Sequence, residues 1–394
     1  MDKKWPHIMG DRMVSMLKRK ILALLLVITM LLGLSSTACA ADANSPDQEN
    51  KMQLTIEQAV NMALNNSKTI AISNLNIERG EEVRDLASDR VKYTPMGPAP
   101  TAATLAYNGL LASDIAWNMA KKSKTVEEDK IVYSVFNDYT TVLKAVKGLK
   151  YAQDAMKSAQ ANWNIACLSY QQGVISTYQR DGAEVHYKVA QNALKLAEIE
   201  LENSYQALNK TLGINITERP VLIEQPGYSI LKVDSLETAV TRTMEDNPAI
   251  WLADQKTYLA QINRDLYDWT NPAREPYEAA NIDINKAQIT ADDLRQTMRQ
   301  AIRIIYNNIA KIEEGYASKE QAVKLAEETR RVTKVKYDIG MATATELQGA
   351  ELDLQKQQNE LDALVYQHEL LKIAFQKPWA YSASTSSSST AEQK

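Results

Sequence analysis

The apolar residues between residues 345 and 376 form one narrow stripe. They recur mostly at intervals of three, four and seven residues, which places them on one face of an α-helix. A stripe this thin gains too little by burial to offset the entropy of ordering the chain, so such a helix needs neighbours on both sides. The pattern predicts long helices in an antiparallel bundle or a closed ring. The stripe comprises Leu347, Ala350, Leu354, Leu361, Leu364 and Leu371.

Proline, glycine and asparagine divide the rest of the chain into predicted helices. Proline cannot lie inside a helix because it lacks the amide donor and clashes with the preceding turn. Thr55 is predicted to be an N-cap, with Gln58 completing a capping box. Predicted helices cover residues 55–64, 68–91, 113–168, 178–212, 235–245, 248–269, 279–336 and 345–376.

The chain repeats one helical plan. Residues 170–176 (YQQGVIS) return as residues 337–343 (YDIGMAT), and a Gly-Ala-Glu triplet follows each copy at the same distance. Residues 55–60 likewise return as 235–240. Such duplication favours a function that belongs to a pseudo-symmetric assembly and not to a single catalytic pocket. The repeated turn positions are Tyr170, Gly173 and Ser176 in the first copy, and Tyr337, Gly340 and Thr343 in the second.

The N-terminus has the pattern of an export signal. A basic flank at residues 18–20 precedes an apolar run that is too short to span a bilayer and that ends in small residues. Cys39 leaves a second possibility, lipid modification, and otherwise Cys167 is the only cysteine of the mature chain. The predicted organisation is a signal peptide at 1–40, a flexible segment at 41–53, a first helical repeat at 54–220, a connector at 221–233, a second helical repeat at 234–380 and a disordered Ser-rich tail at 381–394.

Composition and motifs exclude several classes of function. The net charge of -4 provides no electrostatic footprint for nucleic acid. We find no phosphate loop, nucleophile elbow or zinc signature. His186 and His368 lie apart from any acidic or cysteine cluster with ligand spacing, so both are predicted on solvated helix surface. We therefore expect no enzyme, no cofactor and no metal site.

The duplicated motifs resemble those of the TolC-like outer-membrane efflux factors, from about Leu54 to Phe375. The resemblance implies a homotrimer in which long helices form a hollow cylinder. It also implies that the turns at Gly173 and Gly340 lie at the inner end of that cylinder. There they would contact a periplasmic adaptor that is linked to an inner-membrane pump. The residues implied in this contact are Tyr170, Gly173, Ser176, Gly340 and Thr343.

The resemblance also implies gate residues near the second turn. The family often has an acidic residue six positions after the glycine, and Glu346 stands there, whereas Gln179 occupies the first copy. Tyr337 matches an aromatic residue that helps to close the gate. A basic residue often found two positions after the glycine is replaced by Ala342, which implies a weaker closure.

One part of the family pattern is missing. The family inserts β-hairpins of a membrane barrel where this chain has residues 95–112 and 272–276. A membrane-spanning strand needs about 9–11 residues with alternating faces. Two such strands fit poorly in the first segment and cannot fit in the second. We therefore expect an all-α chain of long antiparallel helices, with the helical barrel kept and the β-barrel reduced or absent.

Two functions follow as hypotheses. The first is an exported efflux component that forms a channel in the cell envelope, or at the outer cell surface if the cell has no outer membrane. The second is a non-conducting coiled-coil scaffold of the cell surface or periplasm. Assembly state separates the two hypotheses, because only the first requires a closed ring.

Overall fold

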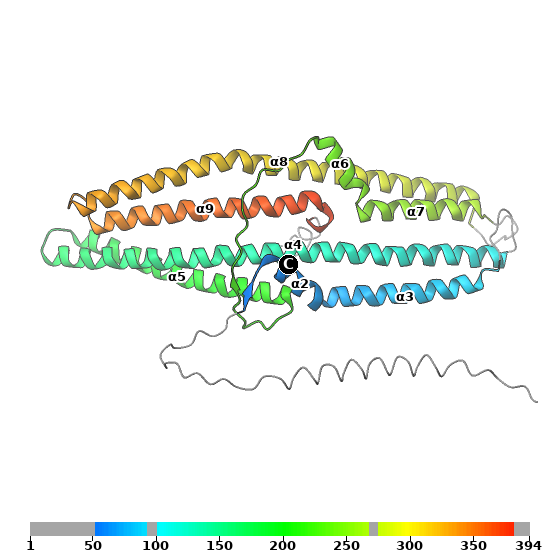
Figure 1. Ribbon diagram of the computed structural model, residues 1–394, viewed down its shortest axis with the longest axis horizontal. Helices are drawn as coiled ribbons and strands as arrows, with labels where there is room; N and C mark the ends of the chain where they lie inside the picture. Colours follow the sequence, from blue (N-terminus) through cyan, green and yellow to red (C-terminus); the bar gives the residue numbers. More distant parts are fainter. Residues whose placement is uncertain (1–51, 93–100, 268–274, 382–394) are drawn as a thin grey trace, which may run out of the picture. The chain divides into compact units, whose positions relative to one another are not determined.

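Long helices form wherever good helix formers run without an internal proline. The computed structural model describes residues 52–92, 101–267 and 275–381, which belong to the compact unit Lys51–Lys394 (Figure 1). The predicted signal peptide, Cys39 and residues 382–394 of the tail lie outside the described residues. The elements are β1 (Gln53–Leu54), α2 (Ile56–Asn66), α3 (Lys68–Arg90), α4 (Thr101–Gln171), α5 (Thr177–Leu212), β2 (Val221–Leu222), α6 (Leu236–Glu245), α7 (Pro248–Asp265), α8 (Tyr277–Asp338) and α9 (Ala344–Gln376).

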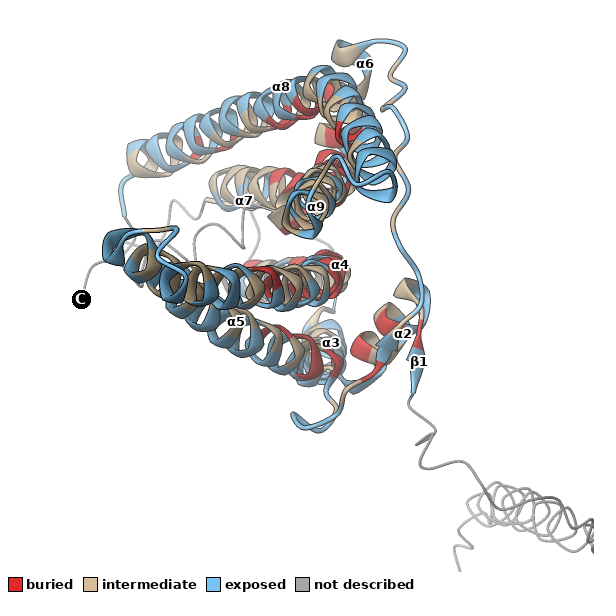
Figure 2. Cartoon of the chain, turned by 90° about the vertical axis from the view of Figure 1, so that its left-hand side faces the viewer, coloured by how far each residue is buried: buried red, intermediate tan, exposed pale blue. Residues whose placement is uncertain are grey.

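The long helices lie side by side in a row (Figure 2). α4 packs against α3 and α5 on one side and against α7 and α9 on the other. α7 and α9 pack in turn against α8. The row therefore has two edges within the described residues, one formed by α8 and the other by α3 and α5.

One hydrophobic core joins the first helices near the middle of α4. It contains Leu54, Ala59, Ala63, Val135, Tyr139, Val142, Leu143, Leu208, Leu212, Val365 and Tyr366. Tyr139 is fully buried, and its hydroxyl donates to the Leu54 carbonyl (3.0 Å) and accepts from the Glu224 amide (3.1 Å). Burial raises the pKa of Tyr139. β1 and β2 pair in parallel beside this core. Through its two hydrogen bonds, Tyr139 of α4 connects β1 with the segment after β2.

A second core lies under α6. Ile302, Ile305 and Ile309 of α8 present one buried face at helical spacing, and Leu371, Ala374 and Phe375 of α9 pack against it together with Val240 of α6. α6 is too short to be a stable helix by itself. It is stabilised by the packing of its apolar face and by the Ser235 N-cap.

The all-α fold class is confirmed, and the capping box of Thr55 and Gln58 is present. One helix start was predicted wrongly: α4 begins at Thr101 and not near residue 113. Residues 101–112 contain no proline and several alanines and leucines, so the helix begins immediately after Pro100. Of the segments where barrel hairpins were considered, residues 93–100 and 268–274 lie outside the described residues.

Asp138 of α4 provides a test of the α4–α5 packing. The Thr211 hydroxyl donates to its carboxylate at 2.6 Å, yet burial is the larger influence and raises the pKa of Asp138. A raised folded-state pKa means that ionised Asp138 lowers stability above that pKa, and that this cost disappears as pH falls through it. We therefore expect Asp138→Asn to unfold at higher urea concentration than the wild type at neutral pH. The difference should shrink in acid, and a constant difference at every pH would contradict this account.

Candidate functional site

The first hairpin turn is closed by backbone hydrogen bonds around a glycine. α4 ends at Gln171, and Gly173 adopts φ +71°, a left-handed conformation that glycine allows without steric cost. Its amide donates to the Tyr170 carbonyl at 2.9 Å, and the Val174 amide donates to the Ser169 carbonyl at 2.9 Å. This arrangement satisfies the last carbonyls of α4 and sends the chain back along it as α5.

The second turn has the same construction. Gly340 adopts φ +76°, and its amide donates to the Tyr337 carbonyl at 3.0 Å. The Met341 amide donates to the Lys336 carbonyl at 2.7 Å. Both turns lie at the same end of the described helices (Figure 1). Across the described ranges, no hydrogen bond or ion pair joins one turn to the other, so each is stabilised within its own hairpin.

A capping box begins the return helix after each turn. Ser176 accepts from the Gln179 amide, and the Gln179 side chain accepts from the Ser176 amide at 2.9 Å. Thr343 and Glu346 form the same pair, with the Thr343 amide donating to the Glu346 carboxylate at 2.7 Å. Sequence reasoning missed this role of the two gate candidates. The signal was present, because a Ser or Thr three residues before a Gln or Glu is the capping-box pattern.

The two capping residues differ in charge. The hydrogen bonds from Thr343, with a smaller contribution from Lys336, hold the pKa of Glu346 below its usual range. Glu346 is therefore ionised at neutral pH, whereas Gln179 caps its helix without charge. Only the second turn can place a carboxylate at this position.

The side chains around the turns are largely apolar and open to solvent. Tyr178 is 87% exposed and Met341 is 75% exposed, and Val174 and Ile339 are also exposed. Tyr337 is exposed, and Tyr170 packs under the Arg180 guanidinium, whose carbon lies 4.6 Å from the ring centroid. Apolar groups at the tips of two hairpins are suited to contact with another protein surface.

Apolar stripes also follow both edges of the row. On α5 the stripe comprises Tyr178, Val185, Val189, Leu196 and Ile199, spaced by three, four and seven residues. On α8 it comprises Ile282, Ile289, Ile304, Leu325, Val332 and Val335. α3 continues the α5 edge with Ile72, Leu75, Val83 and Leu86. The α5 spacing is that of a coiled-coil seam, whereas the exposed apolar residues of α8 are more widely spaced, and in the single chain both stripes face solvent.

One predicted location was wrong. His186 is exposed as expected, but His368 is fully buried. Its Nε2 lies 2.9 Å from Glu313 Oε1 and its Nδ1 lies 3.3 Å from Glu369 Oε1. These carboxylates offset the cost of burying the ring, since a polar group can be buried where it is hydrogen-bonded. Glu313 also accepts from the Leu231 amide at 2.8 Å, so the cluster fastens residues 229–231 to α8 and α9.

The described part of the chain holds no group of three or more His, Cys, Asp or Glu residues that could bind a metal ion. Cys167 is a free thiol. Across residues 52–92, 101–267 and 275–381, no helix combines the length and the apolar character needed to cross a membrane.

Solved structures with a similar fold are outer-membrane channels. The channel OprN has a TM-score of 0.63 at 11% identity, with 82% of this chain and 90% of that chain covered. The Campylobacter jejuni channel CmeC has a TM-score of 0.62 at 13% identity, with 88% and 93% covered. The outer membrane protein VceC from Vibrio cholerae has a TM-score of 0.57 at 14% identity, with 82% and 95% covered.

No family model matches the chain, and a search of the curated proteins found no match. The structural likeness nevertheless extends over most of this chain and of each channel. At these identities it establishes fold. The chain therefore has the fold of the TolC-like outer-membrane efflux channels, as the resemblance of its duplicated motifs implied.

Proposed function

We propose that this protein is an exported, non-enzymatic efflux component that forms a channel in the cell envelope as a homotrimer. The observation that carries the proposal is the pair of exposed apolar stripes at opposite edges of a channel fold. Exposed apolar surface of this extent indicates an interaction face. Its position on both edges fits a chain that has a neighbour on each side.

The two stripes belong to different helices, so contact between copies is heterologous. The α8 edge of one copy would pack against the α3 and α5 edge of the next. Heterologous contacts close into a ring when the rotation between copies allows it, and otherwise continue as open filaments. Three copies is the number that the TolC-like resemblance implies. In such a ring every seam is buried without any change in the fold of the chain.

The paired turns provide the second contact of the proposal. Their exposed apolar side chains and their common position at one end suit docking of an adaptor that belongs to a multi-component export system. Each turn is fixed by a positive-φ glycine and a capping box, so it offers a rigid surface to a partner. Rigid hairpin tips lose little entropy when they bind.

Glu346 provides the test of conduction through this end. In a ring, one ionised Glu346 from each copy would surround the mouth and favour cations through its local field. Glu346→Gln removes the charge but keeps the capping box, since Gln179 fills the same position in the first turn. We expect the variant to assemble normally and to lose severalfold in cation-over-anion selectivity when its conductance is measured in a planar bilayer.

Two companion variants make this result specific. Glu327→Gln removes an exposed carboxylate from α8, away from the turn, and should leave selectivity unchanged. Glu346→Ala removes the charge and the carboxylate that accepts from the Thr343 amide, while the Thr343 N-cap remains. It should cost about 1 kcal/mol of stability, the size of one hydrogen bond, in addition to selectivity. If Glu346→Gln and the wild type show the same selectivity, Glu346 does not control the mouth.

A further inference from the structure

A cavity lies inside the row, where α9 ends and α7 begins. Both of these helices lie between α4 and α8. The cavity lies between the end of α9 at Gln376 and the start of α7 at Pro248, and its volume is about 480 Å³. Its apolar wall comes from α4, α7, α8 and the segment after α9, and it includes two tryptophans and two methionines. The wall residues are Met119, Val126, Trp251, Leu252, Met298 and Trp379.

The matching interval on the other side of α4 is closed. There α5 ends at Leu212, and the side-chain amide of Asn66 donates to the Leu212 carbonyl at 2.9 Å. Gly213 lies so near that an added Cβ would be 2.7 Å from Asn66 Cβ. Asp246 follows α6, at the position that corresponds to Asn66 at the end of α2. Its side chain is exposed and forms no hydrogen bond or ion pair among the described residues. The interval between α5 and α3 is therefore filled, unlike that between α9 and α7.

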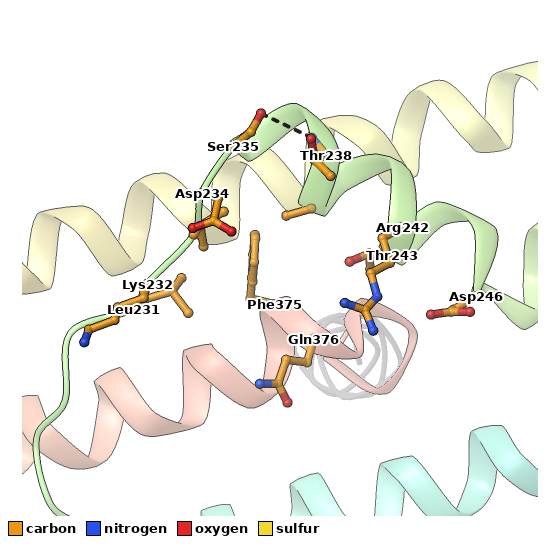
Figure 3. A pocket seen from close by; sticks show the side chains of 12 residues that line it. Leu231, Lys232, Asp234, Ser235, Thr238, Arg242, Thr243, Asp246, Phe375 and Gln376 are labelled. Atoms are coloured by element: carbon orange, nitrogen blue, oxygen red, sulfur yellow. Dashed lines mark hydrogen bonds between the residues drawn. The ribbon is translucent and has the colours of Figure 1, made fainter.

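A second space in the same half of the chain is less suitable for a ligand. It lies beside α6 and is lined by Lys232, Asp234, Arg242 and Asp246 around Phe375 (Figure 3). All four charged side chains are exposed to solvent, and the charges balance. The two positive and two negative charges cancel, so this space has no net preference for an anion or a cation.

The chemistry of the α7–α9 cavity is selective. Tryptophan and methionine walls favour flat, polarisable molecules, and the volume is that of a small-molecule site. At the rim Glu127 is already engaged, because Lys130 Nζ lies 2.6 Å from its carboxylate. Lys122 has no hydrogen bond or ion pair among the described residues, and neither does the Trp251 indole N–H. The Lys122 ammonium and the Trp251 indole can thus donate hydrogen bonds, and the Ser123 hydroxyl of the lining can donate or accept one. The charged lining residues sum to one positive charge.

A further unused donor lies one residue before the cavity lining. Asn247 caps α7 through its carbonyl oxygen, which accepts from the Ala249 amide at 2.9 Å. The residue is 1% exposed, and its Nδ2 has no partner within the described part of the chain. A buried donor without a partner is costly, and such groups in native proteins commonly indicate a missing ligand or water. Pro248, the next residue, lines the cavity.

We propose that this cavity binds a small amphipathic anion with a flat aromatic body, its anionic group near Lys122 and its ring system between the tryptophans. The occupant lies within the wall of helices, apart from the turns and from the edge stripes. Binding there does not depend on conduction, so the site can be tested whether or not the chain forms a channel.

Anilinonaphthalene sulfonate is a suitable probe, since it is a flat aromatic anion whose fluorescence rises in apolar surroundings. N-phenylnaphthylamine is its uncharged counterpart. Ala249 lines the cavity and is half-buried, so Ala249→Phe places a ring in the space. We expect the purified full chain to bind both probes, and Ala249→Phe to weaken both by about tenfold or more, because overfilled space cannot accept a ligand.

The charge is tested separately. Lys122→Glu should weaken the sulfonate probe by about tenfold, the effect of turning an attractive charge contact near the surface into a repulsive one. It should leave the uncharged probe unaffected. Lys150→Glu makes the same change at another exposed lysine of α4, which forms no hydrogen bond or ion pair among the described residues, and should alter neither probe. Lys122 is exposed, so these variants retain the fold.

Two outcomes would overturn the proposal. If a correctly folded Ala249→Phe chain binds the sulfonate probe as the wild type does, the dye occupies another surface, such as the α5 or α8 stripe. If Lys122→Glu and Lys150→Glu weaken the probe equally, general charge and not this rim attracts it. Failure of channel formation would leave the probe measurements unchanged, which separates this proposal from the proposed function.

Discussion

Leu196→Asp is expected to convert the assembled protein into single chains. Leu196 lies in the middle of the α5 stripe and is 67% exposed in the single chain. In the proposed ring it would be buried against α8 of the next copy. An aspartate there would be an unpaired charge in an apolar seam, at a cost of about 3–5 kcal/mol for each contact between copies. Such a cost lowers the association constant by about two to four orders of magnitude.

The matched control is Gln191→Asp. Gln191 is also exposed on α5, but it lies outside the stripe of Val185, Val189 and Leu196. Both variants add one carboxylate to the same exposed helix, so each should keep the helical content of the wild type. Particle mass in dilute solution then separates them. The seam assignment is wrong if Leu196→Asp assembles like the wild type or if Gln191→Asp is equally disrupted.

Gly213→Ala is expected to give the largest loss of folding stability among single-methyl changes at the helix ends. Gly213 caps α5 with φ +68°, a conformation that costs an alanine about 1–2 kcal/mol. In addition, the new Cβ would lie 2.7 Å from Asn66 Cβ, so the Asn66 amide that holds the Leu212 carbonyl must move. Overpacking of this kind adds about 1–3 kcal/mol. The expected total is about 2–5 kcal/mol in urea unfolding.

Gly173→Ala separates the two causes of that loss. Gly173 adopts nearly the same conformation, with φ +71°, but an added Cβ would meet nothing within 4 Å. It should therefore cost only the conformational part, about 1–2 kcal/mol. Equal losses for the two variants would show that the contact with Asn66 contributes nothing. A smaller loss at Gly213 than at Gly173 would contradict the structure at this helix end.

The helical architecture was predictable because local signals agree along the chain. The capping box at Thr55 and the glycine turns at residues 173 and 340 are encoded within a few residues, and the structure shows each in place. The start of α4 was predicted too late, near residue 113, although residues 101–112 themselves favour helix. Following helix propensity alone after Pro100 would have given the correct start.

The location of His368 could not be predicted from its neighbours in sequence. Glu369 is adjacent, but Glu313 lies on α8 and Leu231 lies before α6, and the fold alone brings them together. The same holds for the cavity, which exists because the end of α9 and the start of α7 meet between two other helices. Sequence identifies where helices end, whereas the space between two ends depends on tertiary packing.

The central claim is that copies of this chain close into a hollow ring through their edges. Single-particle imaging of the purified mature protein tests it directly. We predict end-on views with a central opening, in which α8 of each copy lies against α3 and α5 of the next. Single chains, or open stacks whose edge helices stay uncovered, would contradict the ring and would favour a non-conducting scaffold.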